Sequence, residues 1–213
     1  MTPDTAFLSL VQWLSPAFPT GAFSCSHGLE WAIAAGEVTD APTLESWIAD
    51  VLRHGAGRAD AVLLAHALKP AADLDGLSDL ARALAASAER LRETEDQGAA
   101  FAATAGALLG VDLPPRPLPV ALGQAARGLG LPPAQVLALY LHGFAANLVS
   151  AAVRFVPLGQ TEGQQVLAAL HPLISKIADG AAAAPLDSIG SAAFRADMAA
   201  MLHETMDVRI FRT

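Results

Sequence analysis

Residues 133–155, PAQVLALYLHGFAANLVSAAVRF, carry the strongest helical pattern in the sequence. Leu137, Leu141, Phe144 and Leu148 recur every three or four residues, and this spacing places them on one face of an α-helix. Pro157, just beyond this stretch, predicts its end. A central apolar helix is therefore the element around which the rest of the chain is expected to pack.

The same region raises the question of a membrane, because no charged residue occurs at positions 128–153. That length could cross a bilayer. However, Gln135, His142, Asn147 and Ser150 interrupt the apolar run. We therefore expect a buried central helix and no membrane partner.

Further helical patterns fill most of the remaining chain, and no sustained strand-like alternation is present. The composition agrees, because 53% of the 213 residues are hydrophobic and many of them are alanine, the strongest helix former. We predict an all-α fold, a single-domain helical bundle of about eight to ten helices over residues 1–213. The proline-rich stretch 111–119 is the candidate hinge between halves. The other predicted helices cover residues 5–14, 24–35 (capped by Ser24 or Ser26), 42–54, 59–67, most of 77–109 with Gly98 and Gly106 as interruptions, 119–129, 161–179 and 189–204.

Charge and cysteine content narrow the class of function. The formal net charge is −8, and nucleic-acid binding depends on cationic contacts to phosphates, so we expect no nucleic-acid partner. Cys25 is the only cysteine, which suits a reducing compartment. The first residues show no secretory signal pattern. These features predict a cytoplasmic protein.

No catalytic motif is recognisable in the sequence. It contains no P-loop, no dinucleotide-binding glycine motif and no H-E-x-x-H zinc motif. The six histidines include no pair at helical spacing. Cys25 and His27 leave open a Cys/His-dependent hydrolase or a metal site, although a buried thiol and a helix-start histidine are the simpler interpretation. We therefore predict no enzyme, no catalytic or metal-binding residue and no cofactor.

Charged side chains gather at residues 89–96 between alanine-rich stretches. Arg92 is spaced to pair with Glu89, Glu95 and Asp96 along one helix, and each such pair stabilises a helix by only about 0.2–0.5 kcal/mol. A solvated face is one interpretation, and a protein interface is the other. From the residues alone, the chain is a helical bundle without a visible active site.

Four blocks of sequence, in order along the chain, resemble the UreF family of urease accessory proteins. LSPAFPTGAFSCSHGLE at 14–30 resembles the family's N-terminal signature, with Ala22 and Cys25 in place of its usual glycine and tyrosine. The other three blocks are LRETEDQG at 91–98, AVRFVPLGQTEGQ at 152–164, and His203-Glu204 followed by VRIFRT at 208–213.

The resemblance implies a homodimeric, non-enzymatic scaffold. Such a scaffold binds the accessory protein UreD (also called UreH), recruits the GTPase UreG and helps to deliver nickel to apo-urease. The tail 208–213 is expected to be disordered alone and to become ordered on binding UreD. A generic helical adaptor with another client is the alternative.

The candidate partner-binding residues come from these four blocks. The loop at 19–27, the patch at 92–97 and the turn at 160–164 are expected to converge near the dimer axis and to contact UreG. The full set is Pro19, Phe23, Ser24, His27, Glu30, Arg92, Glu93, Gln97, Gln160, Thr161, Gln164, His203, Arg209, Phe211 and Arg212.

Overall fold

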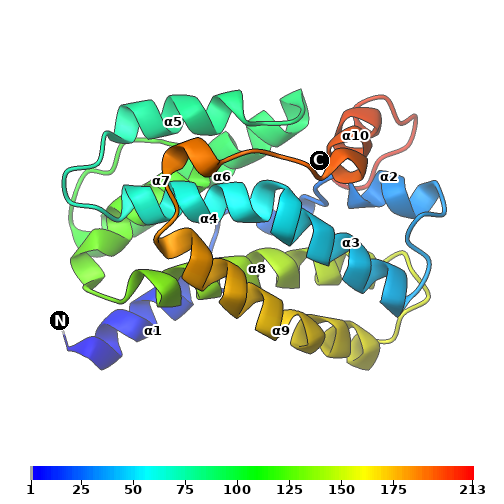
Figure 1. Ribbon diagram of the computed structural model, residues 1–213, viewed down its shortest axis with the longest axis horizontal. Coiled ribbons are helices and arrows are strands. Elements are labelled where there is room, and N and C mark those ends of the chain that lie inside the picture. Colours follow the sequence, from blue (N-terminus) through cyan, green and yellow to red (C-terminus); the bar gives the residue numbers. More distant parts are fainter. Residues whose placement is uncertain (1) are drawn as a thin grey trace.

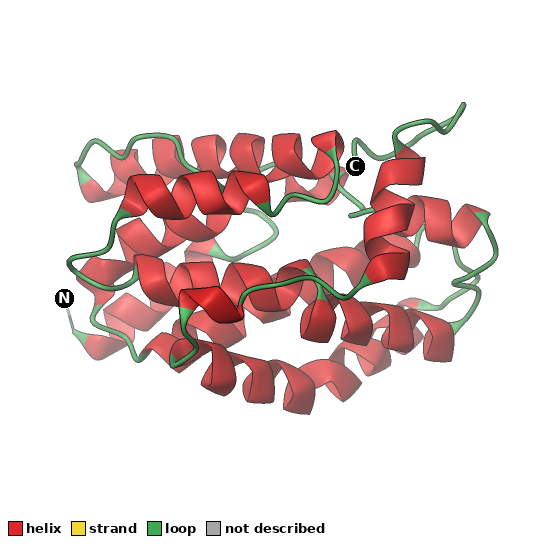
Figure 2. Cartoon of the chain, turned by 45° about the horizontal axis from the view of Figure 1, so that its top comes forward, coloured by secondary structure: helices red, strands yellow, loops and turns green. Residues whose placement is uncertain are grey.

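The computed structural model describes residues 2–213, and these residues form helices and loops without a β-strand (Figures 1 and 2). The all-α prediction is confirmed. The α-helices are α1 (Pro3–Trp13), α2 (Leu29–Ala34), α3 (Ala41–His54), α4 (Ala56–Ala67), α5 (Leu74–Ala83), α6 (Ala88–Leu109), α7 (Leu118–Ala126), α8 (Pro133–Ala152), α9 (Gln160–Ala182) and α10 (Phe194–His203), and the 3₁₀ turns are η1 (Ala22–Ser24), η2 (Arg127–Leu129) and η3 (Leu186–Ser188).

Helix α8 occupies the centre of the molecule, as its sequence predicts. It packs against α9, α4, α3 and α2, and it buries Leu137, Leu141 and Leu148. By length and hydropathy alone α8 could cross a membrane. Its position between other helices is instead that of a core helix.

One continuous hydrophobic core joins the N-terminal and C-terminal halves of the chain. It includes Leu10 of α1, Phe101 of α6, Leu141 of α8 and Ala199 of α10. The molecule is therefore one all-α domain. Many core positions are alanines, which let helices approach closely; the fully buried ones include Ala32, Ala61, Ala105, Ala145 and Ala199.

The helix predicted at 24–35 begins later than expected. Residues 22–24 form η1, and α2 starts only at Leu29. Between them His27 and Gly28 have left-handed backbones, with φ of 59° and 75°. A Cβ on Gly28 would lie 2.6 Å from the Ala200 nitrogen of α10, so this turn brings the loop against α10.

The pattern at 77–109 divides into two helices, and its glycines do not interrupt either of them. The break falls at residues 84–87, where Ser87 caps α6 by accepting a 3.1 Å hydrogen bond from the Arg90 amide. Gly98 lies inside α6, where a Cβ would be 2.7 Å from the Leu118 nitrogen. The proline-rich segment before α7 is thus packed against α6, and the prediction of a hinge between halves is wrong.

The last two predicted helices also shift at their ends. Helix α9 runs from Gln160 to Ala182 with Pro172 inside it, and α10 begins at Phe194. The segment before α10 is held by Ala192, whose amide donates to the His54 carbonyl at 2.7 Å. This places α10 beside α2, so the end of the chain lies near the loop at 19–27 (Figure 1).

Candidate functional site

A buried histidine between two glutamates connects three distant parts of the chain. His203 of α10 lies 2.6 Å from Glu89 of α6 through Nδ1 and 3.1 Å from Glu30 of α2 through Nε2. Each ring nitrogen of His203 thus faces a carboxylate oxygen, and an ionised carboxylate accepts hydrogen bonds. His203 thereby joins α10 to both α2 and α6.

The same two glutamates hold the C-terminal tail. Glu30 accepts hydrogen bonds of 2.9 Å from the amides of Ile210 and Phe211. Glu89 forms an ion pair with Arg209. Burial acts to raise the pKa of Glu30, but the hydrogen bonds from these amides and from His203 outweigh it and hold the pKa below its ordinary value. At neutral pH Glu30 is therefore charged while it holds the tail.

The final residues of the tail are anchored in the same way. The Thr213 carbonyl accepts hydrogen bonds from the Ser26 amide at 2.7 Å and the Ser26 hydroxyl at 2.6 Å. The Thr213 hydroxyl donates to Glu93 at 2.6 Å. Phe211 is buried against Phe155, with ring centroids 5.4 Å apart. In this conformation the tail is part of the folded chain, and its ordering on partner binding stays a prediction.

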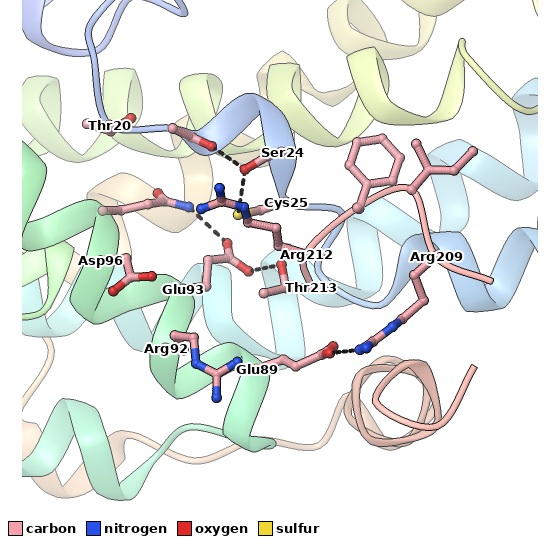
Figure 3. A pocket seen from close by; sticks show the side chains of 14 residues that line it. Thr20, Ser24, Cys25, Glu89, Arg92, Glu93, Asp96, Arg209, Arg212 and Thr213 are labelled. Carbon is pink, nitrogen blue, oxygen red and sulfur yellow. Dashed lines mark hydrogen bonds and ion pairs between the residues drawn. The ribbon is translucent and has the colours of Figure 1, made fainter. Parts of the chain in front are cut away.

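A polar pocket of about 600 Å³ opens between α6, the loop at 20–25 and the tail (Figure 3). Arg92, Glu93 and Asp96 approach it from α6, and Arg209 and Arg212 from the tail. Within residues 2–213 Arg92 makes neither a hydrogen bond nor an ion pair, so its exposed guanidinium is available to another molecule. The walls of the pocket carry charge of both signs.

Behind this pocket a second cavity of about 250 Å³ contains a buried polar cluster. Asp60 accepts a 2.7 Å hydrogen bond from the Tyr140 hydroxyl, and Arg90 forms an ion pair with Glu93. Burial raises the pKa of Asp60 to about 6, although Arg90 and the Tyr140 hydrogen bond oppose this. Glu93 lines both cavities, so the buried cluster and the tail site are in contact.

The structure brings together most of the residues predicted as partner-binding. Ser24, Arg92, Glu93, Gln97, Arg209, Phe211 and Arg212 line the polar pocket, and Glu30 and His203 lie beneath the tail. Pro19 and Phe23 are exposed on the adjacent loop, whereas His27 is buried. Gln160, Thr161 and Gln164 are exposed at the start of α9 and do not line this pocket.

Two local interpretations need correction. The predicted pairs of Arg92 along α6 do not form; Glu89 pairs with His203 and Arg209, and Glu95 pairs with Arg82. The patch is thus held by tertiary contacts and is not merely a solvated helix face. At the start of α9 the cap is not Thr161, because the Gly159 amide donates to Glu162 at 2.9 Å.

Cys25 and His27 do not form a reactive pair. Burial, followed by the charge of Glu93, raises the pKa of the Cys25 thiol, which opposes the reactive thiolate. The His27 ring packs edge-on against Phe144, with centroids 5.0 Å apart. Among residues 2–213, no group of three or more His, Cys, Asp or Glu side chains could hold a metal ion.

Comparison with known proteins identifies the family. Residues 38–171 match the profile of the UreF family. A urease accessory protein UreF from Cereibacter sphaeroides strain KD131 is 76% identical over 210 residues, covering 99% of this chain and 100% of the relative. This chain belongs to the UreF family. UreF proteins of Dinoroseobacter shibae and Ruegeria pomeroyi are 55% and 50% identical, each match covering at least 98% of both chains.

Membership of the UreF family makes the chain a urease accessory protein and not an enzyme. The family profile includes the blocks at 91–98 and 152–164, and the full-length relatives extend the match over nearly the whole chain. The hydrolase alternative built on Cys25 is therefore wrong, in agreement with its buried, protonated thiol.

Sequence reasoning missed several residues of this site. Asp60 and Tyr140 gave no signal, and Glu89 was considered only as a partner of Arg92, because their actual partners lie far away along the chain. Ser26 was considered only as a helix cap, yet it holds the Thr213 carbonyl. A buried glutamate such as Glu30 needs a partner, but the sequence does not say that the partners are tail amides.

Proposed function

We propose that this UreF-family chain is a homodimeric scaffold of urease maturation in the cytoplasm. It binds UreD (UreH) and recruits the GTPase UreG, and the assembly delivers nickel to apo-urease. The family assignment supports a role in urease maturation, and the exposed surfaces of the chain support docking of other proteins.

The observation that carries this proposal is an exposed apolar face on α10 and the tail. Phe194, Met198 and Met201 are 72%, 58% and 51% exposed, and with Leu202 their spacing places them on one side of α10. Ile210 of the tail is 67% exposed and lies at the edge of the polar pocket. Contiguous apolar side chains on a surface mark protein-interaction sites, and methionines adapt well to a partner. We assign this face to UreD.

The tail divides its residues between anchoring and docking. Phe211 and Thr213 are buried in their own chain, so they set the position of the tail. Val208 and Ile210 point outward, with exposures of 76% and 67%. Deleting 208–213 would remove both roles at once, whereas a substitution at Ile210 tests docking alone.

A double substitution of Met198→Glu and Ile210→Asp should abolish co-purification of UreD, because it places charges in an apolar interface. Both side chains are exposed, so the circular dichroism spectrum should not change. Leu8→Glu on α1, which is 63% exposed, is the matched control. Retention of UreD by the double variant would refute the assignment of this face.

The polar pocket and its free arginine are assigned to UreG recruitment. Charged groups at an interface govern orientation and choice of partner more than affinity. Arg92→Glu should therefore reduce UreG recruitment to the complex with UreD and lower urease activation in a reconstituted assay. Arg53→Glu reverses an exposed charge on α3 and serves as the control. Normal UreG binding by Arg92→Glu would show that this pocket does not contact UreG.

A further inference from the structure

Two histidine rings meet on the surface where α8 packs against α9. His142 and His171 have ring centroids 5.4 Å apart, with their planes inclined at 44°. His142 is half-buried and His171 is exposed. The packing of the two helices creates this pair, which explains why no helical spacing in the sequence revealed it.

The nitrogens of these two rings are free. Within residues 2–213, neither ring has a hydrogen bond or an ion pair. By contrast, His203 is held on both sides by carboxylates, and His66 contacts the Ala184 carbonyl at 2.9 Å. Burial, followed by the nearby His171, lowers the pKa of His142. A neutral imidazole nitrogen without a hydrogen-bond partner has a lone pair to donate to a metal ion.

The separation of the rings suits a single metal ion. An ion bound about 2.0–2.1 Å from a ring nitrogen lies roughly 3.2 Å from the centroid of that ring. Two centroids 5.4 Å apart then subtend an angle of about 115° at the ion, close to the tetrahedral value. This arrangement requires one nitrogen of each ring to face the ion.

We infer that His142 and His171 together bind one divalent transition-metal ion of borderline softness, such as Zn²⁺ or Ni²⁺, with water as the remaining ligands. Imidazole nitrogen suits such ions, whereas Mg²⁺ requires oxygen ligands, and no carboxylate among residues 2–213 pairs with either ring. Because only two protein ligands contact the ion, from one side, the ion stays accessible to solvent. The bound ion can therefore exchange with ions in solution. This inference does not depend on the proposed UreD and UreG contacts.

Isothermal titration of the full chain with Zn²⁺ alone, and separately with Ni²⁺ alone, tests the site at neutral pH. We expect one ion per chain. His171→Ala removes an exposed side chain without disturbing the core, and it should raise the dissociation constant at least about tenfold, as should His142→Ala. His54→Ala, which removes an exposed histidine elsewhere, should leave the constant unchanged.

Ring-nitrogen NMR of ¹⁵N-histidine-labelled protein identifies the ligands directly. Adding Zn²⁺ should shift the signals of His142 and His171 together and leave that of the buried His203 in place. Unchanged affinity in His171→Ala, shifts confined to other histidines, or equal binding of Mg²⁺ would overturn the inference.

Discussion

Asp60 accepts a hydrogen bond of 2.7 Å from Tyr140 and feels the charge of Arg90, yet its pKa is raised to about 6 because burial dominates. The folded chain thus holds a proton on Asp60 at pH values where the unfolded chain has lost it. Ionisation of Asp60 above its folded pKa favours the unfolded chain, and the free energy of unfolding falls as the pH rises through the interval between the two pKa values.

Asp60→Asn should remove this dependence. Between pH 4 and pH 7 the stability of the variant relative to the natural chain should increase, by up to about 3 kcal/mol, and then level off above pH 7. Urea unfolding, monitored by circular dichroism at several pH values in this range, measures the difference in unfolding free energy between the two proteins. Asp112→Asn, on an exposed loop, is the control and should show no such trend. A constant difference between Asp60→Asn and the natural chain would mean that Asp60 does not titrate there.

The resemblance to the UreF family predicted which residues form the tail site but not how they contact one another. Arg209 and Phe211 were predicted to bind a partner, and both are side-chain types that are common at interface hot spots. Phe211 instead packs inside its own chain, and Arg209 pairs with Glu89. Such roles depend on contacts between residues that are far apart in the sequence, such as Arg209 and Glu89, which composition and spacing along the chain do not encode.

At the scale of the element, Gly98 of α6 shows how a residue that weakens a helix can be required by the fold. The helix continues through Gly98 because its missing Cβ lets the backbone near Leu118 approach. The sequence suggested an interruption, since glycine disfavours helix interiors. It could not reveal that another segment occupies the space.

Gly98→Ala should therefore destabilise the chain by about 1–3 kcal/mol, because the added methyl group must displace backbone. Gly180→Ala on α9 provides the matched control. A Cβ there meets nothing within 4 Å, so the substitution should stabilise by roughly 0.5–1 kcal/mol. Chemical denaturation of the two variants and of the natural chain measures these changes in the free energy of unfolding. Equal effects of the two substitutions would contradict the close packing of α6 against α7.

At the scale of the whole molecule, we predict a homodimer. Sedimentation velocity should give a particle of about twice the 21.9 kDa chain mass at micromolar concentration. A particle with the mass of a single chain at every concentration tested would contradict this prediction.

The fold was more predictable than the site. Helical periodicity located α3, α8 and α9 closely, because long amphipathic segments carry that signal strongly. The left-handed turn at His27 and Gly28 was not foreseen, because its cause is the approach of α10 from the far end of the chain. Local sequence patterns do not predict a helix boundary or a pocket that depends on contacts between residues distant in the sequence.

The fully buried alanines, such as Ala61, Ala145 and Ala199, have a consequence for how this protein can vary. In an interior lined by leucine or phenylalanine, the damaging mutations are mainly those that shrink a side chain. Here many interior sites already hold one methyl group, so added bulk, even Ala→Val, must push whole helices apart. Random mutagenesis of this protein should thus show its strongest intolerance to gains in side-chain volume, and sequence drift should concentrate on outward-facing positions.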